Sequence, residues 1–112
     1  MDISVNRHTL IPTICIIGEL DLASAPSLSK ALDEFLPIDA PIIVDLSDVT
    51  FIDSSGLSVL VQARQRLGTS STGNPIRLVV VRPAVQRIFE ITGLDQVFEI
   101  YDSNEGAQAK LG

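Results

Sequence analysis

The sequence predicts an α/β domain with about four helices packed on a mixed β-sheet of about five strands. Runs rich in Val and Ile alternate along the chain with segments whose apolar residues recur at helical spacing. The chain has 112 residues, close to the usual size of one domain. Apolar residues make up 46% of it and charged residues 20%, a composition too apolar for disorder. Residues 1–112 are therefore expected to form a single domain.

The first two strands are expected at residues 3–5 and 13–17, joined by a connection that contains Pro12. Their short separation favours a hairpin at one side of the sheet. The single cysteine, Cys15, lies in the second run, where a small buried apolar side chain is expected.

A first helix is expected to begin at Ser24, a residue type that caps helix N-termini, with Pro26 in its first turn. Its apolar residues keep helical spacing as far as Leu36, and a proline then ends the pattern. The run at 42–46 is apolar enough for a central strand buried on both faces, and it continues through 49–52.

A second helix is expected from Ser54 or Ser55 to about Leu67, because its apolar residues share one face and a glycine follows. Ser103 is expected to cap the last helix. After the second helix, a strand is expected at residues 76–81 and a helix at 83–92. A last strand is expected at 97–101 and a last helix at 103–110. Crossovers between parallel strands are expected to be right-handed.

The charge of the chain argues against binding to nucleic acid or to an anionic membrane. The net charge is −6 and no cluster of Lys or Arg occurs, so polyanions are repelled. No apolar run approaches the roughly 18 to 20 residues of a spanning helix, and the N-terminal residues do not resemble a signal peptide. A cytoplasmic protein is expected.

The most informative stretch is residues 45–57, where a strand delivers small polar residues to the start of a helix. Ser54 and Ser55 would lie near free backbone N–H groups at the positive end of the helix dipole, which favours an anion such as a phosphate. Phosphorylation would add about −1.5 to −2 charge there, and Asp53 would strengthen repulsion of an acidic partner. Asp and Ser are also ordinary N-cap residues, so local chemistry leaves plain capping open.

The sequence lacks the residue sets of common enzyme classes. His8 is the only histidine, so no Ser-His-Asp triad is evident, and there is no Cys-x-x-Cys pair for a metal. A phosphate-binding loop of the Gly-x-x-x-x-Gly-Lys type is missing, and so is the acidic pair of a phospho-receiver domain. No catalytic residue, metal or cofactor is expected.

Three segments resemble the STAS domain family, named for sulfate transporters and anti-sigma factor antagonists. Residues 51–57, Phe-Ile-Asp-Ser-Ser-Gly-Leu, are similar to the family's signature at the start of the second helix. Residues 18–21, Gly-Glu-Leu-Asp, and residues 87–94, Arg-Ile-Phe-Glu-Ile-Thr-Gly-Leu, resemble two further family segments. The resemblance covers nearly the whole chain and is greatest to the stand-alone bacterial members.

The resemblance implies an anti-sigma factor antagonist, a binding protein and not an enzyme. The second serine of Asp-Ser-Ser-Gly is the family's phosphoacceptor, which corresponds to Ser55, while Ser54 would support the turn. The unphosphorylated form would bind an anti-sigma factor serine kinase and release the sigma factor. Phosphorylation of Ser55 would switch binding off, and a PP2C-type phosphatase would reset the switch.

The same resemblance places the partner-binding face at the loop of residues 21–24, at residues 53–57 and on the exposed side of the second helix. Other roles stay open for some of these residues: Asp21 as a helix cap, Arg64 or Arg66 as a solvated side chain, and Gly56 as a glycine that permits close approach of a partner to the turn. The implied partner-binding residues are Asp21, Ser24, Asp53, Ser54, Ser55, Gly56 and Leu57.

Two alternatives remain at this stage. Some family members act as scaffolds in sensory signalling complexes without direct control of a sigma factor, and the sequence separates that role poorly from the first. The loop at residues 69–73 carries several hydroxyls, which allow either a second phosphorylation site or an ordinary surface loop.

Overall fold

The computed structural model describes residues 2–6, 11–34, 42–67 and 76–109. These residues form a sheet whose spatial order, β1-β2-β3-β4-β5, repeats the order of the strands in the sequence. β1 pairs antiparallel with β2, and the remaining neighbours are parallel. The strands are β1 (Asp2–Asn6), β2 (Thr13–Leu20), β3 (Ile42–Ile52), β4 (Ile76–Val79) and β5 (Glu99–Tyr101).

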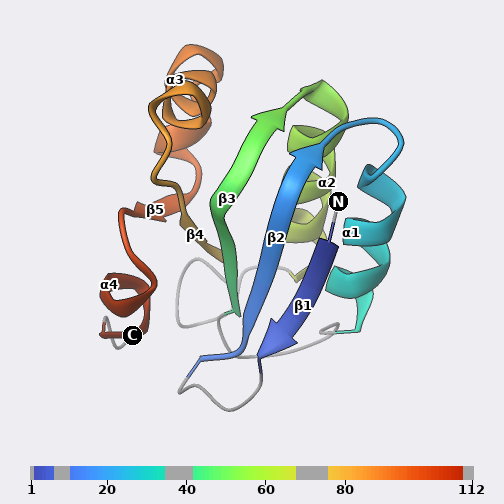
Figure 1. Ribbon diagram of the computed structural model, residues 1–112, viewed down its shortest axis with the longest axis horizontal. Coiled ribbons are helices and arrows are strands. Elements are labelled where there is room, and N and C mark those ends of the chain that lie inside the picture. The colour runs from blue at the N-terminus through green and yellow to red at the C-terminus, as the bar shows by residue number, and fades with distance from the viewer. Residues whose placement is uncertain (1, 7–10, 35–41, 68–75, 110–112) are drawn as a thin grey trace.

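Helices connect the parallel strands, as Figure 1 shows. The α-helices of the described residues are α1 (Ala25–Asp33), α2 (Ser54–Leu67), α3 (Pro83–Thr92) and α4 (Asn104–Ala109), and a short 3-10 helix, η1 (Leu94–Gln96), follows α3. The expected mixed sheet with its hairpin and its four helices is confirmed. None of the described helices is long and apolar enough to cross a membrane.

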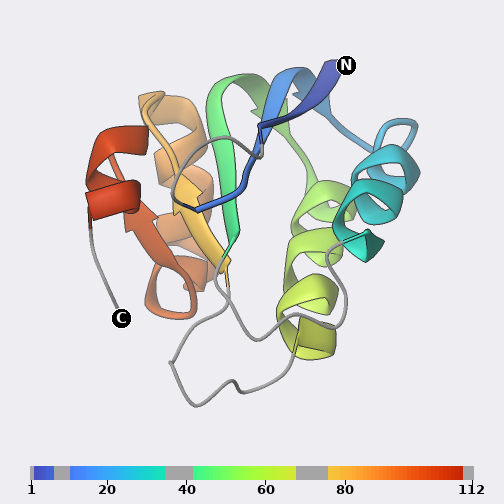
Figure 2. The same ribbon diagram turned by 90° about the horizontal axis from the view of Figure 1, so that it is seen from below.

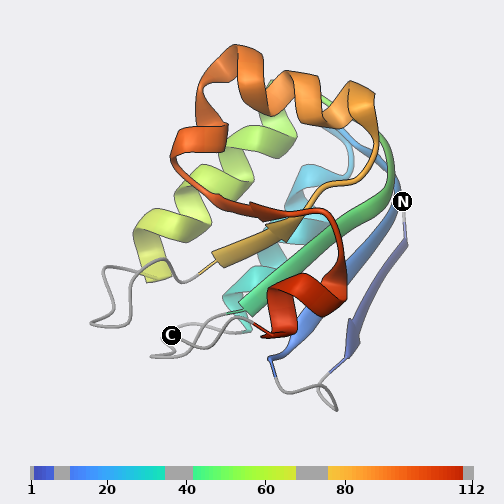
Figure 3. The same cartoon turned by 90° about the vertical axis from the view of Figure 1, so that its left-hand side faces the viewer.

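The helices lie on two faces of the sheet. Alternate residues of a strand point to opposite faces, and Val44 and Leu78 join the large core with α1, α2 and α3. Their neighbours Ile43 and Val79 instead pack with Ala107 of α4. α4 therefore lies across the sheet from α2, as the views in Figure 2 and Figure 3 show.

Several element boundaries differ from the expected ones. α1 ends at Asp33, and residues 35–36 of the expected helix lie outside the described residues. The last strand begins at Glu99 and not at residue 97, because Gly93 adopts the left-handed conformation (φ 75°) and the chain continues into η1. Cys15 is half-buried on the outer face of β2, so the expectation of a buried cysteine is wrong.

Hydrogen bonds hold α4 against the start of β2. Ser103 caps the helix as expected, since its hydroxyl accepts a hydrogen bond from the Gly106 N–H (3.0 Å). The Gln108 side chain pairs with the backbone of Ile11, accepting its N–H (2.7 Å) and donating to its carbonyl (2.8 Å). The guanidinium of the buried Arg77 donates to the Ala107 carbonyl (2.6 Å).

Candidate functional site

The ends of β2 and β3 bring the two predicted partner-binding segments together. The backbone N–H of Asp53, the residue after β3, donates to the carbonyl of Leu20 at the end of β2 (3.1 Å). Asp21 follows Leu20 directly, so the turn that leads into α1 lies beside the first turn of α2. Residues 53–57 are called the α2 tip below.

Asp53 is the N-cap of α2. One oxygen of its carboxylate, Oδ1, accepts hydrogen bonds from the N–H groups of Ser55 (2.9 Å) and Gly56 (3.1 Å). Its carbonyl accepts the first helical hydrogen bond, from Leu57 N–H (3.1 Å). Because Asp53 satisfies these orphan donors, α2 does not require a serine hydroxyl as its cap.

The two serines of the α2 tip differ in exposure. Ser54 is exposed and Ser55 is half-buried. Neither hydroxyl donates a hydrogen bond to any of the described residues. Plain capping, which the sequence left open for Ser55, is therefore not its role in the structure.

Gly56 and Leu57 face the interior of the molecule. A Cβ atom at position 56 would lie 2.6 Å from the Leu20 Cγ and 2.9 Å from the Leu20 carbonyl oxygen. The segment that approaches Gly56 closely is thus β2 of the same chain, whereas a partner was expected there. Leu57 is only 8% exposed and packs in the core with the other apolar residues of α2.

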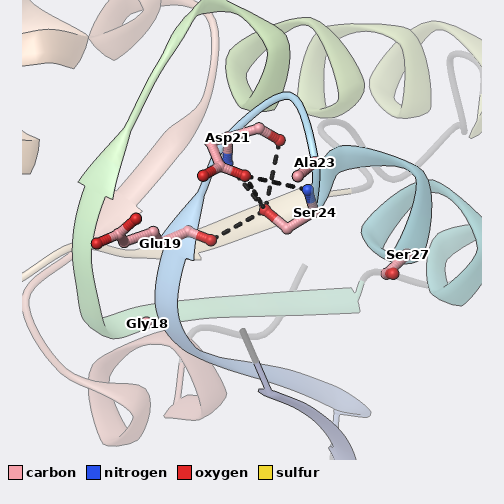
Figure 4. Close-up of a pocket in the computed structure, with 6 residues that line it drawn as sticks. All are labelled: Gly18, Glu19, Asp21, Ala23, Ser24 and Ser27. Atoms are coloured by element: carbon pink, nitrogen blue, oxygen red, sulfur yellow. Dashed lines mark hydrogen bonds between the residues drawn. The ribbon is translucent and has the colours of Figure 1, made fainter.

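Asp21 and Ser24 close the turn before α1 through side-chain hydrogen bonds (Figure 4). The Ser24 hydroxyl accepts the Asp21 N–H (2.9 Å) and donates to the Glu19 carbonyl (2.9 Å), and it also contacts Asp21 Oδ1 (3.0 Å). Asp21 Oδ1 accepts the Ser24 N–H (3.1 Å). Hydrogen bonds from the Ser24 side chain, and then from its backbone, hold the pKa of Asp21 below its ordinary value.

Ser24 occupies the N-cap position of α1, but its hydroxyl makes no capping hydrogen bond to the helix. The expectation of a Ser24 side-chain cap is therefore wrong. The hydroxyl turns back towards Asp21 and Glu19, because the preceding residues form a hydrogen-bonded turn of their own. A polar hollow beside this turn is lined by Gly18, Glu19, Asp21, Ala23, Ser24 and Ser27.

Substitution Ser24→Ala is expected to raise the pKa of Asp21 towards its ordinary value, because the largest stabiliser of the carboxylate is removed. A carboxyl titration by ¹³C NMR measures this pKa in both proteins. Because the folded pKa is lowered, Asp21 contributes stability above its unfolded pKa, and that contribution is lost as the pH falls through the folded pKa. Ser27→Ala, in the same hollow, is the matched control and should leave the Asp21 titration unchanged.

A second, more apolar hollow of about 340 Å³ lies beside the α2 tip. Sequence reasoning noted Leu94 only as part of the segment 87–94 and did not place it beside the α2 tip. Leu94 belongs to η1 and partly packs against the core, and the position of η1 brings it to this hollow. The hollow is lined by Ser54, Leu57, Ser58, Val61, Gln62 and Leu94.

The exposed side of α2 includes Gln62, but Arg64 is only partly exposed. The Arg64 Nε is buried and has no hydrogen-bond partner among the described residues, so the solvated role left open for Arg64 does not apply to this atom. The side chain of Arg66, the other residue named for that role, lies outside the described part of the chain. Among the described residues, no group of three His, Cys, Asp or Glu side chains could hold a metal ion.

Comparison with known proteins relates both the fold and the sequence to one family. The model of the STAS domain matches residues 2–107. The anti-sigma-B factor antagonist of Bacillus subtilis is 30% identical over 106 residues, covering 95% of this chain and 94% of the relative. The anti-sigma-F factor antagonist RsfB of Mycobacterium tuberculosis is 32% identical over 104 residues, covering 90% and 81%.

A solved structure agrees with these sequence matches. The crystal structure of an anti-sigma factor antagonist from Mycobacterium paratuberculosis superimposes with a TM-score of 0.83 at 30% identity. The match covers 95% of this chain and 89% of that one. With a family model that spans residues 2–107 and relatives of similar length, the chain belongs to the STAS domain family.

Proposed function

We propose that this protein is an anti-sigma factor antagonist that acts by partner switching. In its unphosphorylated form it binds an anti-sigma factor with serine kinase activity, and the sigma factor bound to that kinase is released. Relatives that carry the name anti-sigma factor antagonist support this proposal, because they align over most of this chain. The protein itself is a binding module of the cytoplasm and not an enzyme.

The observation that carries the proposal is the free hydroxyl of Ser55 at the α2 tip. Asp53 already caps the helix, so the Ser55 Oγ is not needed to hold the turn. In the proposed modification, Ser55 Oγ bonds to the γ-phosphorus of ATP as the bond from that phosphorus to the bridging oxygen breaks. ADP leaves, and the hydroxyl proton passes to a base of the kinase.

The phosphate would act on binding mainly through its charge. The modification adds about −1.5 to −2 charge near neutral pH. The Asp53 carboxylate already accepts hydrogen bonds from two backbone N–H groups in the first turn of α2. A phosphate on Ser55 would therefore lie beside a negative charge, and repulsion between the two would turn the phosphate towards solvent. The proposed switch therefore repels the kinase locally, with little change in the fold.

The partner surface combines the α2 tip with the turn at Asp21 and Ser24, which lie side by side at the ends of β2 and β3. Gly56 and Leu57 contribute from inside, since both are buried and fix the position of the tip. A PP2C-type phosphatase would remove the phosphate from Ser55 and restore binding.

Phosphate mapping tests the proposal. The purified chain is incubated with ATP and the anti-sigma factor kinase captured on it from its own cells, and the products are analysed by mass spectrometry. We expect one phosphate on Ser55 in the wild type and no phosphate in Ser55→Ala, with Ser54→Ala modified normally. If the captured partners lack kinase activity and Ser55 stays unmodified, the protein is instead a scaffold of a signalling complex.

A further inference from the structure

Among the described residues, α4 is the helix that packs on the outer side of the sheet, and it leaves most of β1, β2 and β3 uncovered there. Figure 1 views this face directly, with α1 and α2 behind the strands. α4 contacts the sheet at β3, β4 and β5, where Ala107 packs on Ile43 and Val79. Parallel strands such as β2 and β3 are rarely left open on either face. This part of the sheet is therefore a candidate interaction surface.

Two large apolar side chains are exposed on this face. Ile17 is 50% exposed and Phe51 is 49% exposed. Their sequence neighbours Ile16 and Ile52 are buried in the core beneath α1 and α2. Because side chains alternate along a strand, Ile17 and Phe51 point away from that core. They are the kind of half-buried anchors that a partner can cover.

The strand register surrounds these anchors with carboxylates. Ile17 pairs with Asp2 on β1 and with Asp48 on β3, and Phe51 pairs with Glu19 on β2. Asp2, Glu19 and Asp48 are all exposed. Each apolar anchor thus has an acidic side chain beside it on a neighbouring strand.

The charge on this face selects the kind of partner. β1, β2 and β3 contain no Lys, Arg or His, although the exposed Arg82, from beyond β4, donates to the Ser47 carbonyl of β3 (3.2 Å). Burial is the largest cause that raises the pKa of the Cys15 thiol, and the nearby carboxylates of Asp45 and Asp48 raise it further. The effect of the two carboxylates is consistent with a negative potential on this face. An anionic membrane would be repelled, and a second copy of the chain would bring carboxylates against carboxylates. A partner with a basic surface is complementary in charge to this face.

We propose that the open face, formed by Asp2, Ile17, Glu19, Asp48 and Phe51, binds an amphipathic helix of a partner protein. The apolar stripe of that helix contacts Ile17 and Phe51, and its Lys and Arg side chains pair with the flanking carboxylates. The helix lies beside α4 and completes the layer that α4 begins. The open face is on the side of the sheet opposite α2. It adjoins the proposed kinase surface at one end, because Glu19 lines the hollow beside the turn at Asp21 and Ser24.

Titration with model helices tests this proposal. The ¹⁵N-labelled chain is titrated with a synthetic amphipathic helix of Leu and Lys, and separately with a matched helix of Leu and Glu. We expect saturable NMR shifts centred on Ile17, Asp48 and Phe51 with the basic helix alone. Ile17→Ser and Phe51→Ser should each weaken binding about tenfold, because each removes an apolar anchor. Ile91→Ser, which changes another exposed isoleucine on α3, should leave the affinity unchanged.

Reversal of one charge separates specific docking from general attraction. Asp48→Lys should weaken binding of the basic helix and allow the acidic helix to bind, with the amide spectrum showing an intact fold. Shifts spread over the whole acidic surface, or equal effects of Ile17→Ser and Ile91→Ser, would overturn the proposal. Sedimentation of the free chain as a dimer that Ile17→Ser dissociates would assign the face to a second copy instead.

Discussion

Ser55→Asp is expected to weaken binding to the anti-sigma factor kinase at least about 100-fold, a loss of about 2.7 kcal/mol. The new carboxylate would lie next to the Asp53 carboxylate at the α2 tip, where the unmodified protein has an uncharged hydroxyl. Desolvating this additional, unpaired charge against the kinase costs several kcal/mol of binding free energy. Ser55→Ala should bind within about threefold of the wild type, because the Ser55 hydroxyl donates no hydrogen bond to the described residues. Isothermal titration calorimetry with the purified kinase measures both affinities.

Ser54→Asp is the matched control for this prediction. Ser54 is the exposed neighbour of Ser55 in the same helix turn, so the substitution adds the same charge one residue away. Its effect should be about tenfold or less, since an exposed charge is screened by solvent. Equal losses for the two aspartates would mean that the total charge of the tip, and not the position of Ser55, controls binding.

Gly56→Ala is expected to destabilise the protein by about 2 kcal/mol, although alanine favours helices over glycine by about 1 kcal/mol. The added methyl group would lie 2.6 Å from Leu20 Cγ and 2.9 Å from the Leu20 carbonyl oxygen, so the end of β2 must move away. Urea unfolding followed by circular dichroism measures the free energy of unfolding.

Ser58→Ala, an exposed substitution two residues further along α2, should change that free energy by less than about 0.5 kcal/mol. A stable Gly56→Ala protein that fails to bind the kinase would assign the glycine to the partner interface. Loss of stability with partial binding would instead support the packing role that the structure gives it.

The fold was predictable because its elements are marked locally. Apolar runs located the strands, and the prolines and glycines located most helix ends, as Pro83 and Gly93 do for α3. The first half of β3 is buried on both faces as expected, with Ile42, Ile43 and Val44 at most 1% exposed. The second half differs, because Asp48, Thr50 and Phe51 are exposed. Which part of β3 is covered depends on where α4 docks, which the sequence of β3 does not encode.

The candidate site was predictable only in part. The local sequence placed Asp53, Ser54 and Ser55 at a helix start but could not decide which side chain caps the helix, since Asp and Ser both serve as N-caps. The constraint on Gly56 arises from Leu20, a residue on another strand. The choice of cap and the constraint on Gly56 both depend on contacts between segments that are distant in the sequence. A single sequence does not show such contacts.

The order of the strands has a consequence for how the chain folds. Each strand pairs with its predecessor in the sequence, so the sheet can grow by successive additions that close only modest loops. The pairing of Gln108 with Ile11 is of another kind, because it joins residues 97 positions apart. Because formation of the sheet shortens the loop that this contact closes, we expect α4 to dock after the strands have paired. Before that step none of the described helices would cover the outer side of the sheet, and newly made chains would expose their strands to one another.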